Sequence, residues 1–151
     1  AILDVLCRSM KWKPTDIFSC PHNYAAQEQN GWILRKGAVS AREGERILIP
    51  ANMRDGILLA VGKGNADWNC SAPHGSGRLL KREDVAKRYT LSQFKAAMKG
   101  IHCSCISRDT LDGAPFAYRD IRTIASQVEA TAEIKRLLTP VYNYKAGSKN
   151  G

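Results

Sequence analysis

Long apolar runs are missing from this sequence. None approaches the roughly 18 consecutive apolar residues that a membrane-spanning helix needs. The first residues, AILDVLCRSMKWKP, lack the charged and then apolar layout of a signal peptide. Internal repeats and low-complexity tracts are also absent, and no initiator methionine precedes Ala1, which suggests a processed chain, a cloned domain or a fragment. We therefore expect a cytoplasmic protein that has no membrane partner.

Cysteines are few, and their number is odd: Cys7, Cys20, Cys70, Cys103 and Cys105. They form no array typical of disulfides, so reduced thiols are expected. Cys20 and His22 are two residues apart, and each could bind a metal ion. Cys70 and His74 would complete the two sulfurs and two imidazoles that zinc accepts. Neither pair has the spacing of a zinc finger, so a structural zinc site is only an alternative.

Negative charge is scarce. Asp and Glu number 14 against 23 Lys and Arg, which gives a formal net charge of +9. Such an excess favours a polyanionic partner, such as nucleic acid, a nucleotide or an anionic surface. A basic protein without such a partner is the alternative that charge alone leaves open.

Turn residues divide the chain into predicted strands and helices. Apolar and β-branched runs bounded by glycine, proline or asparagine predict strands over 31–40, 45–53, 57–65 and 101–106. Apolar spacing predicts helices over 2–10, 79–89, 91–99 and 117–130, and a helical turn and last strand within 133–145. Strands cluster early and helices late, which predicts an α+β fold with a mixed or antiparallel sheet flanked by helices. We expect one region over residues 1–145 and a flexible tail over 146–151.

The stretch SAPHGSGRLLKR, residues 71–82, contains the residue types of a phosphate site. A glycine-rich turn that opens a helix would present free backbone N–H groups to an anion. Arg78 and Arg82 are four residues apart, so a helix there would carry both guanidinium groups on one face. A neutral His74 imidazole beside such a turn could attack a phosphorus atom. An ordinary loop histidine beside flexible glycines is the alternative.

This stretch contributes one of five blocks that occur in a recognisable order: His-Asn-Tyr-Ala from His22, Arg-Lys-Gly-Ala from Arg35, Ile-Pro-x-x-Met from Ile49, His-Gly-Ser-Gly-Arg from His74 and Ala-Tyr-Arg-Asp-Ile from Ala117. This order resembles the RtcB-type RNA ligases, the GTP-dependent tRNA-splicing ligase family. The resemblance runs from about Phe18 to Lys145 and covers what would be the C-terminal catalytic part of such a ligase.

The resemblance implies a guanylyl-transfer reaction. The family joins an RNA 3′-phosphate, or 2′,3′-cyclic phosphate, to a 5′-hydroxyl end through a covalent histidine–GMP intermediate formed from GTP. His74 matches the histidine that attacks GTP. Gly75, Ser76 and Gly77 would let the nucleotide approach the backbone closely, and Arg78 and Arg82 match arginines that meet phosphate groups.

The resemblance assigns roles to four more residues. His22 matches a histidine that helps to hold manganese (Mn2+), for which imidazole is a suitable ligand. Tyr118 and Lys145 match residues near the guanine, where an aromatic ring can stack and an ammonium can donate to the carbonyl oxygen. Asn52 stands in the block that precedes the methionine and is expected to meet the nucleotide. Arg35 and Lys36 could face the RNA backbone, although a solvated strand end is an equal alternative.

Departures from the family pattern leave two function classes open. The family's upstream half, which carries an aspartate, a cysteine and further histidines for two metal ions, has no counterpart here, so we expect it to be supplied in the same protein or by another chain. Ile57 and Gly113 stand where relatives usually have serine and glutamate. The chain is therefore expected to be either the C-terminal region of an RNA ligase or a non-catalytic nucleotide- or RNA-binding remnant.

Overall fold

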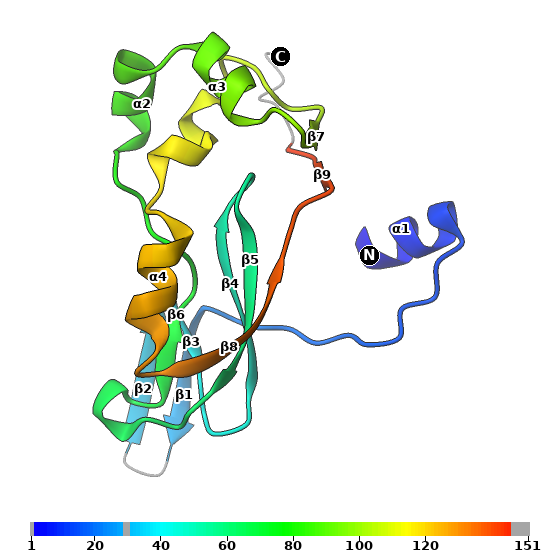
Figure 1. The fold of residues 1–151 in the computed structure, drawn as a ribbon. Helices are drawn as coiled ribbons and strands as arrows, with labels where there is room; N and C mark the ends of the chain where they lie inside the picture. Colours follow the sequence, from blue (N-terminus) through cyan, green and yellow to red (C-terminus); the bar gives the residue numbers. More distant parts are fainter. Residues whose placement is uncertain (1, 29–30, 146–151) are drawn as a thin grey trace.

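The computed structural model describes residues 2–28 and 31–145, shown as a ribbon in Figure 1. The α-helices are α1 (Ile2–Met10), α2 (Arg82–Arg88), α3 (Leu91–Ala97) and α4 (Ile121–Val128). The strands are β1 (Asn23–Glu28), β2 (Gly31–Lys36), β3 (Ala38–Ser40), β4 (Arg46–Asn52), β5 (Gly56–Gly62), β6 (Ser71–Pro73), β7 (His102–Cys103), β8 (Ala132–Leu138) and β9 (Tyr142–Asn143). Segregated helices and mostly antiparallel strands make this an α+β fold, as the sequence predicts. The predicted tail, residues 146–151, lies outside the described residues.

Strands β4, β5 and β8 form the largest sheet, in which β5 is central and both pairings are antiparallel. The β4–β5 register shifts between Pro50 and Asn52, where proline has no N–H to give to the ladder. Gly56 begins β5 with a φ of +93°, and a Cβ there would lie 2.1 Å from the carbonyl oxygen of Leu138. The close approach of β8 to β5 therefore needs a glycine at this position.

Three two-stranded pairs complete the β-structure. β1 pairs with β2 and β3 with β6, both antiparallel, while β7 and β9 form a short parallel pair. The sequence does not predict β1, because Asn23–Glu28 alternates in burial without containing a large aliphatic residue. The predicted strand over 31–40 divides at Gly37 into β2 and β3, so each half pairs with a different partner.

Helix α4 covers the large sheet and forms the first hydrophobic core. Ile124 and Val128 are buried against side chains of β4 and β5, and Ile121 and Ala125 pack at the edge of the same cluster. These four positions are the apolar face that helical spacing predicts for this segment. Asp120 caps the helix by accepting a hydrogen bond from the N–H of Arg122 at 2.7 Å.

Helices α2 and α3 belong to a second core. Phe94, Val85 and Met98 are buried there together with Leu111. Thr90 caps α3: its hydroxyl accepts from the N–H of Gln93 in a reciprocal capping box. Both helices are shorter than the apolar pattern suggests, because Lys81 and Met98 already have non-helical backbone.

Two other expectations differ from the structure. The predicted helical turn within 133–145 is strand β8, since pairing with β5 outweighs the local helix preference of its Leu, Lys and Arg residues. The predicted strand over 101–106 is reduced to β7.

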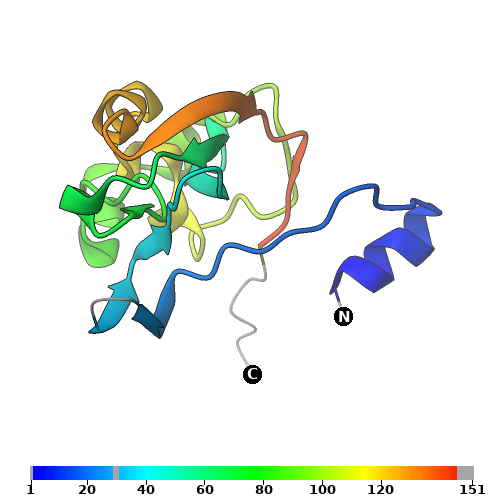
Figure 2. The ribbon, with the colours of Figure 1, turned by 90° about the horizontal axis from the view of Figure 1, so that it is seen from below.

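Helix α1 stands apart from the other elements in both views of the chain (Figures 1 and 2). Within residues 2–28 and 31–145, no helix is long and apolar enough to cross a membrane.

We predict that Phe94→Ala lowers the free energy of unfolding by about 3–5 kcal/mol, the usual cost of emptying a buried aromatic site. Phe94 is fully buried in the second core. Denaturant unfolding followed by circular dichroism measures the change. Lys95→Ala, at an exposed position of the same helix, is the control, and an equal loss in both variants would contradict the assignment of this core.

Candidate functional site

Two histidines from distant parts of the sequence meet at the end of the short β3–β6 pair. The rings of His22 and His74 stack with centroids 4.7 Å apart and planes inclined by 26°. His22 directly precedes β1, and His74 directly follows β6. The β3–β6 ladder aligns Ala38 with Pro73 and so brings the two histidine segments together. The two imidazoles therefore lie at the same edge of the fold.

The carbonyl oxygen of Gly37 determines the orientation of the His74 ring. The Nδ1 atom of His74 lies 2.6 Å from this oxygen. A carbonyl oxygen can only accept, so Nδ1 carries the proton and Nε2 keeps its lone pair. Gly37 is itself held by its N–H, which donates to the carbonyl of His22 at 2.9 Å and the side-chain oxygen of Asn23 at 3.0 Å. The arrangement presents Nε2 of His74 as a potential nucleophile or metal ligand.

The glycine-rich turn after His74 is fastened to the end of β4. The hydroxyl of Ser76 donates to the carbonyl of Ala51 at 2.8 Å, and its N–H donates to the carbonyl of Pro50 at 3.0 Å. Gly77 has a φ of +67°, and a Cβ there would lie 2.7 Å from a guanidinium nitrogen of Arg119. The Ile-Pro-x-x-Met and His-Gly-Ser-Gly-Arg blocks are therefore in contact.

The expectation that this turn opens a helix is wrong. Residues 78–81 have no helical structure, and α2 begins at Arg82. Gly77 leads instead into an isolated antiparallel bridge between Arg78 and Tyr118. Consequently the two arginines do not lie on one helical face, and a helix terminus behind the glycines contributes no dipole to this site.

Arg78 is anchored by protein groups. Its guanidinium donates to the carbonyls of Leu80 at 3.0 Å and Asp112 at 2.6 Å, and to the hydroxyl of Tyr118 at 3.2 Å. It also lies over the Tyr118 ring, 5.0 Å from the centroid. Three of its five N–H groups are therefore used within the protein. A phosphate could meet only the remaining two.

Asp112 connects the residues that sequence reasoning places around the nucleotide, although that reasoning did not identify it. Its carboxylate accepts from Arg82 at 2.5 Å and from the Lys145 ammonium at 3.4 Å. Burial raises the pKa of Asp112, but the charge of Lys145 and the hydrogen bond from Arg82 outweigh this, so the pKa lies below the usual value for aspartate. A Cβ at Gly113 would come within 3.0 Å of the Lys145 ammonium, so the glycine leaves room for this pair.

Asn52 is engaged in the β4–β5 turn. Its side-chain oxygen accepts from the N–H groups of Arg54 and Asp55, and its amide nitrogen donates to the carboxylate of Asp55 at 2.8 Å. The neighbouring carbonyl of Met53 accepts from the amide of Asn143 at 2.7 Å. The turn thus contacts β9, and the oxygen and nitrogen of the Asn52 side chain both bond within their own turn.

The zinc alternative is not supported. Among residues 2–28 and 31–145, no three His, Cys, Asp or Glu side chains gather as a metal site would require. Cys20 and Cys70 contact instead the carbonyls of Arg46 and Gly64. His22 and His74 bring two imidazoles together, but no third His, Cys, Asp or Glu side chain among the described residues joins them as a metal site would require.

Arg35 is buried, so neither of the two alternatives for this residue, contact with the RNA backbone or a solvated strand end, fits the structure. Only 2% of its surface is exposed. Its guanidinium pairs with Glu28 at 2.6 Å and donates to the hydroxyl of Ser71 and the carbonyl of Asn69. The hydrogen bond from Arg35 is the main reason that the pKa of Glu28 lies below its usual value. A charge without a partner could not remain at this depth.

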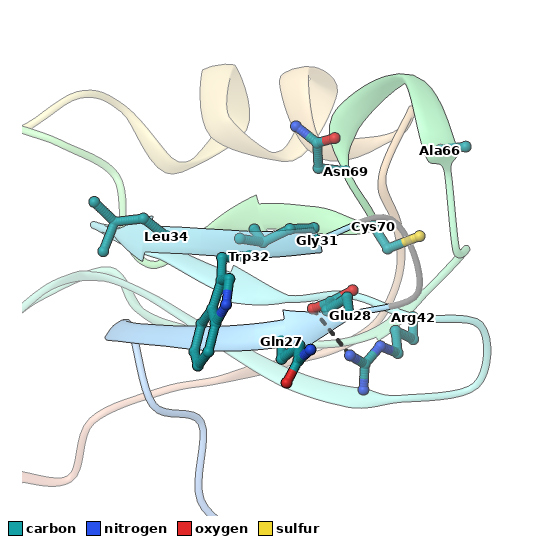
Figure 3. A pocket seen from close by; sticks show the side chains of 10 residues that line it. Gln27, Glu28, Gly31, Trp32, Leu34, Arg42, Ala66, Asn69 and Cys70 are labelled. Carbon is teal, nitrogen blue, oxygen red and sulfur yellow. Dashed lines mark ion pairs between the residues drawn. The ribbon is translucent and has the colours of Figure 1, made fainter.

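The same Glu28 lies in the wall of a pocket between the β1–β2 hairpin and the segment around Asn69. Its carboxylate forms an ion pair with the guanidinium of Arg42 at 2.9 Å, which Figure 3 marks with a dashed line. Of the candidate site residues that the sequence offers, the lining of this pocket contains Cys70, which belongs to the zinc alternative, and none of the residues expected around the nucleotide.

Comparison with known proteins agrees with the family that these blocks indicate. The family model described as tRNA-splicing ligase RtcB matches residues 1–146. The RNA-splicing ligase RtcB of Escherichia coli is 32% identical over 120 residues, which are 77% of this chain and 29% of that protein. The tRNA-splicing ligase RtcB of Aeropyrum pernix is 36% identical over 100 residues, which are 63% of this chain and 20% of that protein.

A third relative, the tRNA-splicing ligase RtcB of Pyrobaculum aerophilum, is 26% identical over 150 residues, or 81% of this chain and 31% of that protein. The fold and the paired histidines thus occur in a chain that is similar to RNA-splicing ligases over part of their length. This chain belongs to the RtcB family. It spans about a third or less of the length of the curated relatives it matches.

We predict that Gly37→Ala displaces the His74 ring. An added Cβ would lie 3.3 Å from Cε1 of His74, and the φ of +70° strains any residue other than glycine. We expect a loss of more than about 1 kcal/mol in stability and a shift of the His74 imidazole resonances in nuclear magnetic resonance spectra.

Gly44→Ala is the matched control, because Gly44 has a φ of +75° and a methyl group added there would have nothing within 4 Å. It carries the same backbone strain without a histidine beside it. His74 resonances that respond equally to both variants would contradict the role of Gly37.

Proposed function

We propose that this chain is the C-terminal catalytic region of a GTP- and manganese-dependent RNA ligase. The reaction would join an RNA 3′-phosphate, or 2′,3′-cyclic phosphate, to a 5′-hydroxyl end through a GMP group carried on His74. The observation that carries the proposal is the His74 ring, whose Nδ1 proton is held by the Gly37 carbonyl. Membership of the RtcB family makes RNA the expected substrate. The excess of basic residues suits such a polyanion.

The geometry supports nucleophilic attack by His74. Nε2 would form a bond to the α-phosphorus of GTP while the bond to the bridging oxygen breaks and pyrophosphate leaves. The imidazole becomes positively charged as the new bond forms. The Gly37 carbonyl already accepts the Nδ1 proton and would therefore stabilise this charge. GMP would then pass to the RNA 3′-phosphate, and the 5′-hydroxyl would displace it.

The cations around Asp112 would bind the remaining parts of the substrates. Arg82 has a side chain that is 72% exposed and can reach a phosphate oxygen by exchanging Asp112 for it. Tyr118 and Lys145 would meet the guanine, the ring by stacking and the ammonium by donating to the carbonyl oxygen. Gly75, Ser76 and Gly77, which lie between His74 and Arg78 in sequence, would let the nucleotide approach the backbone closely. Arg78 would mainly hold this loop in place.

Manganese does not fit a site made from the described residues alone. His22 offers one imidazole beside His74, and no third ligand is near enough to form a site. A single imidazole holds a divalent ion weakly. We therefore propose that the remaining ligands come from the upstream half of a family member, as part of the same protein or as a complementing chain.

A cytoplasmic location is part of the proposal. Its support is that none of the five cysteines is in a disulfide, as expected in a reducing compartment.

We predict that the 151-residue chain alone forms little or no covalent GMP adduct. Joined to the upstream half of a family member, or mixed with it, the chain should form an adduct that needs manganese and disappears in His74→Ala. Labelled GTP followed by denaturing electrophoresis measures the adduct. His102→Ala is the control, because His102 is an exposed histidine outside the site.

A strong manganese-dependent label on the isolated chain would show that the missing ligands are not needed. A completed protein that binds GTP but takes no label would favour the non-catalytic, nucleotide-binding remnant.

We predict that Arg82→Ala weakens GTP binding to the completed protein by on the order of 1–3 kcal/mol, the range of one charge-assisted hydrogen bond. Arg82 is preferable to Arg78 for this test, because the loss of Arg78 would also free the loop that it holds. Arg88→Ala, in the last turn of the same helix, controls for the change in net charge. Equal affinities in the two variants, measured by calorimetric titration, would remove Arg82 from the site.

A further inference from the structure

Two thiols lie side by side at the end of β7. The Sγ atoms of Cys103 and Cys105 are 3.0 Å apart, and neither residue takes part in the proposed ligase chemistry. Both are free cysteines. The sulfurs of a disulfide are about 2.05 Å apart, so the two would need to approach by only about 1 Å to form the bond.

The segment that carries the two thiols also holds strand β9. The hydroxyl of Tyr142 donates to that of Ser104 at 2.8 Å, and the thiol of Cys105 contacts the carbonyl of Asn143 at 3.9 Å. The N–H of Ser104 also donates to this carbonyl, at 3.4 Å. Lys145 follows two residues later, and its ammonium reaches Asp112. The thiol pair therefore adjoins the strand that positions a proposed guanine-binding residue.

We propose that Cys103 and Cys105 are the site of a reversible disulfide, and that closing it loosens β9 and displaces Lys145. The consequence for nucleotide binding rests on the proposed function, in which Lys145 meets the guanine.

The oxidant is a small-molecule disulfide of the glutathione class. Cys103 is partly exposed, whereas Cys105 is 6% exposed, so the oxidant meets Cys103 first. The Cys103 thiolate attacks glutathione disulfide and expels one glutathione. Cys105 then loses its proton and attacks the Cys103 sulfur, which expels the second glutathione. Two protein thiols are oxidised, and one glutathione disulfide is reduced.

The environment of Cys105 gives the reduced form its stability. Burial, followed by the hydrogen bond with Cys103, raises the pKa of Cys105 to about 11, although the backbone N–H and charge of Lys145 act in the opposite direction. The thiol of Cys105 thus stays protonated at neutral pH and can donate to Asn143. A disulfide has no S–H group, so oxidation removes this donor and turns the sulfur away from β9.

The test uses a variant in which Cys7, Cys20 and Cys70 are serine and only the pair remains. The variant is equilibrated with glutathione disulfide, and its intact mass and its amide hydrogen exchange over residues 140–145 are measured. We expect a monomer that loses two hydrogen atoms, regains them with dithiothreitol and exchanges faster over 140–145 when oxidised. A further Cys105→Ser change should block this loss and leave one glutathione bound to Cys103.

A pair that stays reduced, or that takes up glutathione without releasing it, would overturn the disulfide. Unchanged exchange over 140–145 after the disulfide has formed would overturn its link to Lys145. In the completed protein, oxidation should weaken GTP binding on the order of tenfold, the loss of one charge-assisted hydrogen bond. If the reduced completed protein binds no GTP, the proposed ligase function is refuted. The disulfide is still tested by the intact mass, and its effect on β9 by the hydrogen exchange over 140–145.

Discussion

The short antiparallel ladder between β3 and β6 determines the geometry of the whole site. Its three rungs connect the segment that carries His22 and Gly37 to the segment that carries His74. The bond between Gly37 and the His74 ring depends on this alignment, because a slip of one residue would turn every side chain to the opposite face. Buried Arg35, in β2, stabilises the same region because its guanidinium donates to Glu28 of β1 and to Ser71 at the start of β6. A few polar contacts therefore hold these segments in register, a role that packing of apolar side chains has in the two hydrophobic cores.

The blocks of the sequence identify the family and the paired histidines, and apolar spacing identifies α4 with its buried face. Other features have no local signal. Asp112 accepts hydrogen bonds from Arg82 and Lys145, which are 30 and 33 residues away in sequence. The sequence next to Asp112 does not distinguish it from other acidic residues. Arg35 looks like any strand arginine, because its burial depends on Glu28 and on a distant backbone carbonyl. The helix expected behind the glycines fails because Arg78 pairs with Tyr118. Tertiary contacts decide all three cases.

The site combines a rigid half and an exchangeable half. The histidine pair and the glycine turn are held by backbone carbonyls, whose positions are set by strand pairing. The cations around Asp112 are held by one carboxylate that is partly exposed to water. An incoming phosphate can replace a carboxylate with little loss, since both are anionic oxygen acceptors for arginine. In the proposed reaction, the His74 ring would thus be preorganised, whereas Arg82 and Lys145 would adapt to the ligand.

The position of β8 beside β5 constrains the order in which the chain can fold. The β4–β5 hairpin closes locally, but its third strand comes from the far side of the second core, which lies between β5 and β8 in sequence. Closing so long a loop costs conformational entropy, which is offset only once the contacts between β5 and β8 have formed. Until β8 arrives, the hairpin exposes an unpaired edge to other chains during synthesis. Gly56, which admits β8 so closely, therefore also allows β8 to cover that edge.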